Sequence, residues 1–258
     1  MARRLLAAAG ALAVLSAPAS LASTSHRVRH ARHTRHHASR SIGPAGSSAP
    51  ATAGGSSDGP LVGTFELAPG TYSAGAGAGG SYFRMINPGG SVASGPYFDN
   101  SSSTASDHSY TLLRPGSDGG LVTGAFQPAP SPAFDGQGSA LAARIVSPEP
   151  FEGRSFSLST ASPDGQAATS VPAPAVVDSG GSLRGQVEAF DAEWNGQWFN
   201  QGSPKPGGAS PGATQPVSGT YNPDTHAFVL VWASTVVGGP FNGFTGYWHL
   251  AGTFVRAG

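Results

Sequence analysis

The sequence predicts an all-β protein, an antiparallel β-sandwich or barrel, because short alternating segments are separated by turn residues and no amphipathic helix interrupts them. The chain of 258 residues contains 38 glycines and 22 prolines, which leave almost no room for a long helix. Short strands at regular spacing with Gly- and Pro-rich turns are typical of sandwiches and barrels. The chain has no cysteine. The fold must therefore be stable without disulfides, and thiol catalysis and thiolate metal sites are excluded.

The first predicted strand covers residues 61–67, where the alternation places Leu61, Phe65 and Leu67 on one face. The same pattern predicts further strands before the middle of the chain. These are 110–113, 121–126, 140–146 and 154–160.

The strongest strand pattern lies near the C-terminus. Residues 226–233 carry apolar side chains at both odd and even positions, which predicts a central strand buried on both faces. Residues 247–254 follow, with Trp248, Leu250 and Phe254 on one face. Asn242-Gly243 stands between these two segments, and this dipeptide predicts a type I′ hairpin turn.

A sequence repeat predicts that the fold is built from two related modules. Leu-Val-Thr-Gly-Ala-Phe-Gln-Pro at 121–128 is matched by Pro-Val-Ser-Gly-Thr-Tyr-Asn-Pro at 216–223, and the surrounding matches extend the copies to about 82–158 and 198–250. A repeated supersecondary unit buries its apolar face against its twin.

The N-terminal region is predicted to be an export signal followed by a disordered tail. Residues 1–22 have a basic start, an apolar core and a Ser-Leu-Ala cleavage motif, which predicts a signal peptide and a secreted protein. The apolar core is too short for a membrane span, which needs ~20 residues. Residues 23–60 contain a basic His/Arg-rich stretch and a Gly/Ser/Ala/Pro linker, and residues 61–258 are predicted to form a single β domain.

The charge is segregated between these regions. The tail carries five arginines and one aspartate, whereas residues 61–258 carry six arginines and one lysine against thirteen acids. The tail could bind anionic cell-wall polymer or nucleic acid without sequence specificity, could take up metal ions loosely through its histidines, or could be a solvated leader. The body gives no signal for specific nucleic-acid recognition.

A candidate ligand-binding site lies where the two copies differ. It consists of Asp191, Glu193, Trp194, Asn195 and Trp198. Indole rings stack on sugars, and carboxylates and amides hydrogen-bond to hydroxyl groups, so this composition favours a glycan site. Asp191 and Glu193 could instead serve a carbohydrate-active hydrolase, although neighbours at i and i+2 of one strand do not flank a scissile bond well. In the third interpretation the two tryptophans are core or hairpin aromatics, and the two acids form a solvated face.

No catalytic motif accompanies these residues. The chain has no G-x-S-x-G nucleophile turn, no G-x-x-x-x-G-K-[ST] phosphate loop and no H-E-x-x-H zinc helix. The sequence therefore predicts no catalytic residues, no cofactor and no metal site.

The closing stretch of the chain contains Gly-Thr-Tyr at 219–221, Gly-Gly-Pro-Phe-Asn-Gly at 238–243 and Trp-His-Leu at 248–250. It resembles uncharacterised secreted all-β proteins of actinobacteria. The resemblance implies export and a β architecture, and it implies no activity. The Gly-Thr-Tyr and Trp-x-Leu elements are also similar to those of small ligand-binding barrels of the calycin type.

These observations together favour a secreted, non-catalytic β-module that binds cell-envelope polymer or glycan. Two alternatives stay open, namely an extracellular carbohydrate-active hydrolase and a small-ligand-binding barrel.

Overall fold

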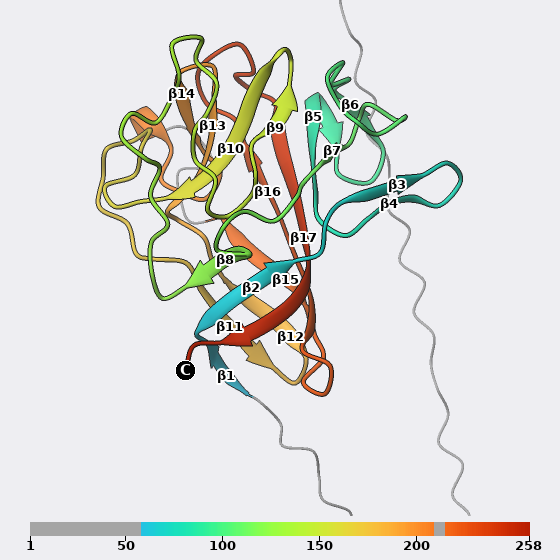
Figure 1. Ribbon diagram of the computed structural model, residues 1–258, viewed down its shortest axis with the longest axis vertical. Coiled ribbons are helices and arrows are strands. Elements are labelled where there is room, and N and C mark those ends of the chain that lie inside the picture. Colours follow the sequence, from blue (N-terminus) through green and yellow to red (C-terminus); the bar gives the residue numbers. More distant parts are fainter. Residues whose placement is uncertain (1–57, 209–214) are drawn as a thin grey trace, which may run out of the picture. The chain divides into compact units, whose positions relative to one another are not determined.

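The computed structural model describes residues 58–208 and 215–258, all of which belong to one compact unit. These residues form an antiparallel all-β protein, as the sequence predicts (Figure 1). The predicted signal peptide and all but the last three residues of the predicted tail and linker lie outside the described residues. Within the described ranges, no helix is long and apolar enough to cross a membrane.

The chain passes through seventeen strands and one short 3₁₀ helix in these ranges. They are β1 (Gly59–Leu61), β2 (Gly63–Leu67), β3 (Thr71–Ser73), β4 (Gly77–Gly79), β5 (Tyr82–Ser91), β6 (Gly95–Tyr97), β7 (Thr111–Leu112), β8 (Gly120–Thr123), β9 (Glu149–Phe151), β10 (Arg154–Thr160), β11 (Ala175–Ser179), β12 (Ser182–Gln186), β13 (Phe190–Trp194), β14 (Gln197–Asn200), η1 (Pro206–Gly208), β15 (Pro216–Tyr221), β16 (Ala227–Thr235) and β17 (Thr245–Arg256).

The largest sheet is strongly curved and approaches a barrel (Figure 1). Its strands follow the order β1-β11-β12-β15-β16-β17-β2-β8. The long strand β17 pairs over residues 245–253 with β16 on one side. On its other side its first half pairs with β5 and its second half pairs with β2. Strand β5 in turn pairs with β6 and β7, and β3 and β4 form a separate hairpin arm that projects from the body.

A second sheet, in the order β14-β13-β10-β9, packs its apolar face against the large sheet. Aromatic rings fill the space between the two sheets. The ring of Phe156 on β10 lies 5.7 Å from that of Phe83 on β5, and Phe190 on β13 lies 5.1 Å from Trp232 on β16. Because the chain has no disulfide, this aromatic layer is a main source of its stability.

The predicted apolar faces of the first and last strands are confirmed. Leu61, Phe65 and Leu67 are buried together, although the segment divides into β1 and β2 at the exposed Val62. Trp248, Leu250 and Phe254 are buried on β17.

Two predicted strands need correction. Strand β16 is central, but only its Phe228, Leu230 and Trp232 face is buried, and the alternate positions from Val229 are partly exposed. The reason is that an antiparallel sheet of this kind keeps one face toward solvent. Residues 140–146 form isolated bridges and bends instead of a strand.

The predicted type I′ turn at Asn242-Gly243 is also wrong. Only Gly243 has a positive φ there, and the Asn242 side chain accepts a hydrogen bond from the Gly238 amide within a longer loop. The type I′ geometry instead occurs at the matching Glu152-Gly153, where both residues have positive φ and join β9 to β10.

The segments that match in sequence take different places in the sheets. Strand β8 pairs with β2 at one end of the strand order, whereas its counterpart β15 lies between β12 and β16. Likewise β10 belongs to the second sheet, while its counterpart β17 is central in the large one. The sequence similarity therefore describes strand-and-turn units that meet in the core, where the rings of Phe151 and Phe241 lie 5.6 Å apart.

Candidate functional site

The strand alternation of β13 divides the residues predicted to form a ligand site. Asp191 and Glu193 share one face of the strand, as i and i+2 positions must, and both are 0% exposed. Trp194 is buried on the opposite face, where its Nε1 donates to the carbonyl oxygen of Phe151 at 2.7 Å. Trp194 is thus a core residue that faces away from the two acids.

Asn195 and Trp198 have different surroundings. Asn195 (φ 52°) and Gly196 (φ 70°) form the two-residue type I′ turn between β13 and β14, which accounts for an Asn-Gly pair at this place. Trp198 pairs across the strands with Glu193, so it lies on the acidic face of the sheet. Its ring remains partly exposed and meets Phe134 edge-on at 4.8 Å.

The loop between β10 and β11, residues 161–174, covers the acidic face of β13. Beneath it lies a buried polar cluster, which consists of Asp164, Asp191, Glu193, Asn200 and Lys205. Asp164 comes from the loop and accepts hydrogen bonds from the loop amides of residues 166 and 167 and from the Asn200 side chain. The Gly165 amide donates to Asp191 Oδ2 at 2.9 Å, which ties the loop to β13.

Lys205 is the cation of this cluster. Its ammonium group donates to the Asn200 carbonyl oxygen and to Ser234 Oγ, the latter at 2.6 Å. Burial lowers the pKa of Lys205 to about 8, although the negative charges of Asp164 and Asp191 oppose that effect. The ammonium group is thus linked to both strands, β14 and β16.

The pKa values of the two carboxyl groups on β13 are both raised. Burial, followed by the charge of Asp164, raises the pKa of Asp191 well above its usual range. Burial raises the pKa of Glu193 to about 7, and the nearby Ser159 hydroxyl opposes this only in part. Among the described residues, Asp191 Oδ1 and both Glu193 oxygens have no hydrogen bond of ordinary geometry. The cluster is therefore under electrostatic strain, since buried carboxyls without partners favour the protonated form.

Carboxyl groups with shifted pKa values often mark catalytic sites. Asp191 and Glu193, however, are not accessible to a substrate. Asp191, Glu193 and Asn200 are all fully buried, and none of them lines the apolar cavity of the interior. A glycan cannot reach the two acids unless the covering loop opens.

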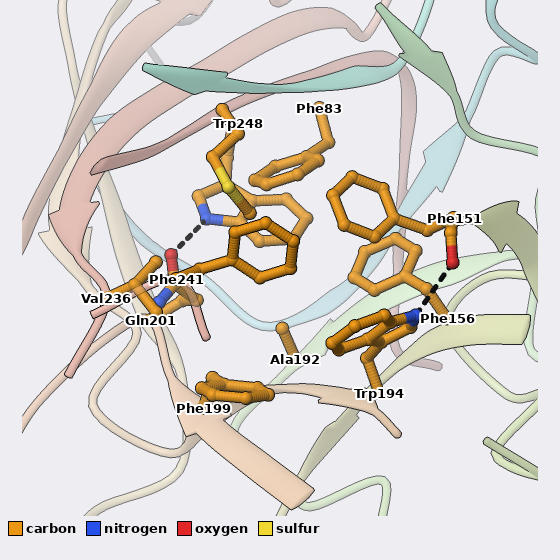
Figure 2. Close-up of a pocket in the computed structure, with 11 residues that line it drawn as sticks. Phe83, Phe151, Phe156, Ala192, Trp194, Phe199, Gln201, Val236, Phe241 and Trp248 are labelled. Atoms are coloured by element: carbon orange, nitrogen blue, oxygen red, sulfur yellow. Dashed lines mark hydrogen bonds between the residues drawn. The ribbon is translucent and has the colours of Figure 1, made fainter. Parts of the chain in front are cut away.

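The interior of the fold contains a small apolar cavity of about 30 Å³ (Figure 2). Phenylalanine and tryptophan rings surround it, and the two hydrogen bonds drawn there, from Trp194 to Phe151 and from Trp248 to Gln201, satisfy the two indole N–H groups. Ligand pockets measure roughly 300–1,000 Å³. The cavity is therefore a packing gap about the size of one water molecule.

The outer face of β5 and β17 carries a group of aromatic side chains that the sequence interpretation missed. We call it the tyrosine face, and each of its members is partly exposed. It consists of Tyr72, Arg84, Tyr82, Tyr97, Tyr110, Tyr247 and His249. The strand register brings them together, because Tyr82 pairs with His249 and Arg84 pairs with Tyr247. Five of the six tyrosines of the chain lie here.

Arg84 is the centre of the tyrosine face. Its guanidinium carbon lies 3.2 Å from the ring centroid of Tyr97 and 4.0 Å from that of Tyr110, which is a cation–π arrangement on two rings. Its Nη2 donates to Ser109 Oγ at 2.7 Å. These contacts hold Arg84 firmly, and the rings of Tyr97 and Tyr110 are held with it.

Ring contacts link the other members of the tyrosine face. Tyr82 lies parallel to His249, with centroids 4.5 Å apart and planes 6° apart, and it meets Tyr110 edge-on at 5.2 Å. His249 Nδ1 donates to the Gly80 carbonyl oxygen at 3.0 Å, which leaves Nε2 as an acceptor. Burial lowers the pKa of His249, so the imidazole is neutral at pH 7. The ring of Tyr72 contacts that of Tyr110, with centroids 5.6 Å apart.

A signal for this face was present in the sequence. In 82–85 the residues Tyr82 and Arg84 alternate with the buried Phe83 and Met85, and Tyr247 and His249 flank the buried Trp248 in the same way. Aromatic residues at the solvent-facing positions of amphipathic strands are the pattern that indicates such a surface.

No metal-binding group among the described residues and no related protein points to a functional site. In residues 58–208 and 215–258, no group of three or more histidine and acidic side chains is arranged to hold a metal ion. No family model, no curated protein and no solved structure matches the chain.

Proposed function

We propose that this protein is a non-catalytic binding module that holds a cell-envelope polymer or other glycan on the tyrosine face, and that it acts outside the cell. The single observation that supports the proposal is the partly exposed array of five tyrosines fixed around Arg84 on one face of the sheet. Tyrosine offers an apolar ring for the C–H face of a sugar and a hydroxyl group for its polar edge.

The rigidity of the face supports the same function. The stack of Tyr82 on His249 and the cage around Arg84 fix the rings before a ligand arrives. Binding to a preformed face loses less conformational entropy than binding to mobile side chains. Sugars are bound weakly, so this preorganisation is of particular value for a glycan.

The two alternatives receive less support. A hydrolase would use Asp191 and Glu193, which are sealed beneath the loop that contains Asp164. A small-ligand barrel would need an interior cavity, and the one described has a volume of about 30 Å³.

A binding assay on the full chain tests the proposal. The wild type should sediment with purified cell wall or with insoluble polysaccharide, and the Tyr82→Ala/Tyr110→Ala double variant should lose at least roughly tenfold in affinity, since stacked aromatic pairs each contribute ~1 kcal/mol. Phe126→Ala is the matched control, because Phe126 is an exposed aromatic residue outside the tyrosine face. Equal binding by the double variant and the control, or a wild type that binds no polysaccharide, would refute the proposal.

A further inference from the structure

The surface of the tyrosine face continues along the chain toward Arg114. Leu112 pairs with Tyr82 across β7 and β5. Thr111 and Leu113 are buried, whereas Tyr110 and Leu112 are partly exposed and Arg114 is exposed. The alternation therefore places Tyr110, Leu112 and Arg114 on one side of the strand.

A groove of about 300 Å³ opens at this end of the tyrosine face. It lies between the end of β7, the start of β9 and the segment that joins β2 to β3, and its lining is mixed apolar and polar. The lining residues are Gly70, Thr104, Leu112, Arg114, Glu149 and Pro150. A volume of this size is at the lower end of the range for ligand pockets, and it is an order of magnitude larger than the interior cavity.

Arg114 is held in place by a carboxylate behind it. Its Nε donates to Glu149 Oε1 at 2.8 Å and its Nη2 donates to Oε2 at 3.3 Å. The side chain of Glu149 is 4% exposed, whereas that of Arg114 is 62% exposed. The buried partner therefore orients an exposed guanidinium group.

The guanidinium group retains capacity for a second acid. Arginine has five N–H donors, of which two point to Glu149, so three remain. The planar fork of arginine suits carboxylate and phosphate oxygens. The exposed Thr104 lines the same groove and adds a hydroxyl donor.

We propose that this groove binds an acidic group, a carboxylate or a phosphate, of the polymer whose neighbouring sugar lies on the tyrosine face. The inference rests on the proposed function, because Leu112 of the groove pairs with Tyr82 of the tyrosine face, and one polymer chain would lie across both. Arg114 is the residue that selects acidic over neutral polymers.

The test uses the full chain and three probes. Polygalacturonate supplies carboxylates, its fully methyl-esterified form has the same backbone without the charge, and poly(glycerol phosphate) supplies phosphate. The wild type should bind an acidic probe at least roughly tenfold more tightly than the ester, and the preference should shrink as salt is raised. Which of the two acidic probes binds more tightly identifies the acid.

Arg114→Gln should abolish the preference while binding of the methyl ester stays unchanged. This variant leaves Glu149 without its partner, so Arg114→Gln/Glu149→Gln provides a second variant without a buried unpaired charge. Thermal melting should show that the double variant is folded. Arg114→Lys should retain part of the preference.

The outcomes separate the two proposals. A wild type that binds the acidic probes and the ester equally, or Arg114 variants that keep the full preference, overturns the groove proposal and leaves the tyrosine face intact. Loss of ester binding in Tyr82→Ala/Tyr110→Ala tests the face independently. Absence of binding to every probe overturns both.

Discussion

Three of the four tryptophans and five of the six tyrosines of this protein occupy opposite environments. Trp194, Trp232 and Trp248 are buried in the layer between the two sheets, whereas five of the six tyrosines share one partly exposed face. The buried indoles donate hydrogen bonds to protein oxygens. The comparison teaches that aromatic content alone does not locate a binding site, because the same ring chemistry builds a core when the strand alternation points inward.

The sharpest way to break this comparison is to truncate one ring from each region. Trp248→Ala should lower the free energy of unfolding by ~3–5 kcal/mol, since Trp248 is fully buried and the variant leaves a large void. Tyr82→Ala should cost clearly less, because Tyr82 is at the surface. Urea unfolding monitored by circular dichroism measures both. Comparable losses in the two variants would contradict the division into core and surface aromatics.

The buried polar cluster is a third environment. Removing the positive charge of Lys205 should lower the free energy of unfolding nearly as much as removing the Trp248 ring. Lys205→Met should lower the free energy of unfolding by about 3 kcal/mol, because Asp164 and Asp191 then lack a nearby positive charge. Adding Asp191→Asn should recover part of the loss. A double-mutant cycle in urea checks this, and strictly additive losses would show that the two groups do not interact.

The pH dependence of stability tests the same cluster on a smaller scale. Burial raises the folded-state pKa of Glu193 to about 7, while the unfolded value is 4.5. The folded state therefore binds more protons between these values, and stability falls as the pH rises from 4.5 to 7, by up to about 3 kcal/mol. Asp191 acts in the same sense, because its pKa is also raised. Unfolding measured at pH 5 and at pH 8 should show the decline, and Glu193→Gln should reduce it. An equally steep decline in Glu193→Gln would assign it to other groups.

The smallest effect on stability is expected from substitutions of Asn195. They test whether this residue serves the turn or contacts a ligand. Its φ of 52° favours glycine, so Asn195→Gly should leave stability within a few tenths of a kcal/mol, and Asn195→Ala should cost about 1 kcal/mol. Neither variant should change polysaccharide binding. Weaker binding in both variants, with stability unchanged, would return Asn195 to the ligand site.

Much of the fold was predictable because the strand period is short and local. The burial of Leu61, Phe65 and Leu67 and the shared face of Asp191 and Glu193 follow directly from alternation. Two of the failures reflect one limit, which is that a local pattern does not reveal which elements pair with a segment or cover its face. Residues 140–146 look like a strand but run as irregular chain, and the second face of β16 looks buried but lies toward solvent.

The candidate site shows the same limit. Composition selected Asp191, Glu193, Trp194, Asn195 and Trp198, yet only the register of β13 and β14 reveals that Trp194 faces away from the acids. The tyrosine face unites residues from β3, β5, β6, β17 and the segment before β7, which are distant in the sequence. Such a surface follows from strand pairing across the sheet, and a single sequence without an alignment does not supply that pairing.

The course of strand β17 places the C-terminus away from the tyrosine face. Beyond its end, the Ala257 amide donates to the Val62 carbonyl oxygen at 3.1 Å, so the first and last described segments leave the fold at the same pole (Figure 1). His249 lies on the same strand, roughly 20 Å of extended chain away from Arg256. A fluorophore, affinity tag or solid support joined after Gly258 would therefore stand clear of the tyrosines, and the protein could be immobilised in one orientation with its aromatic surface presented to solution.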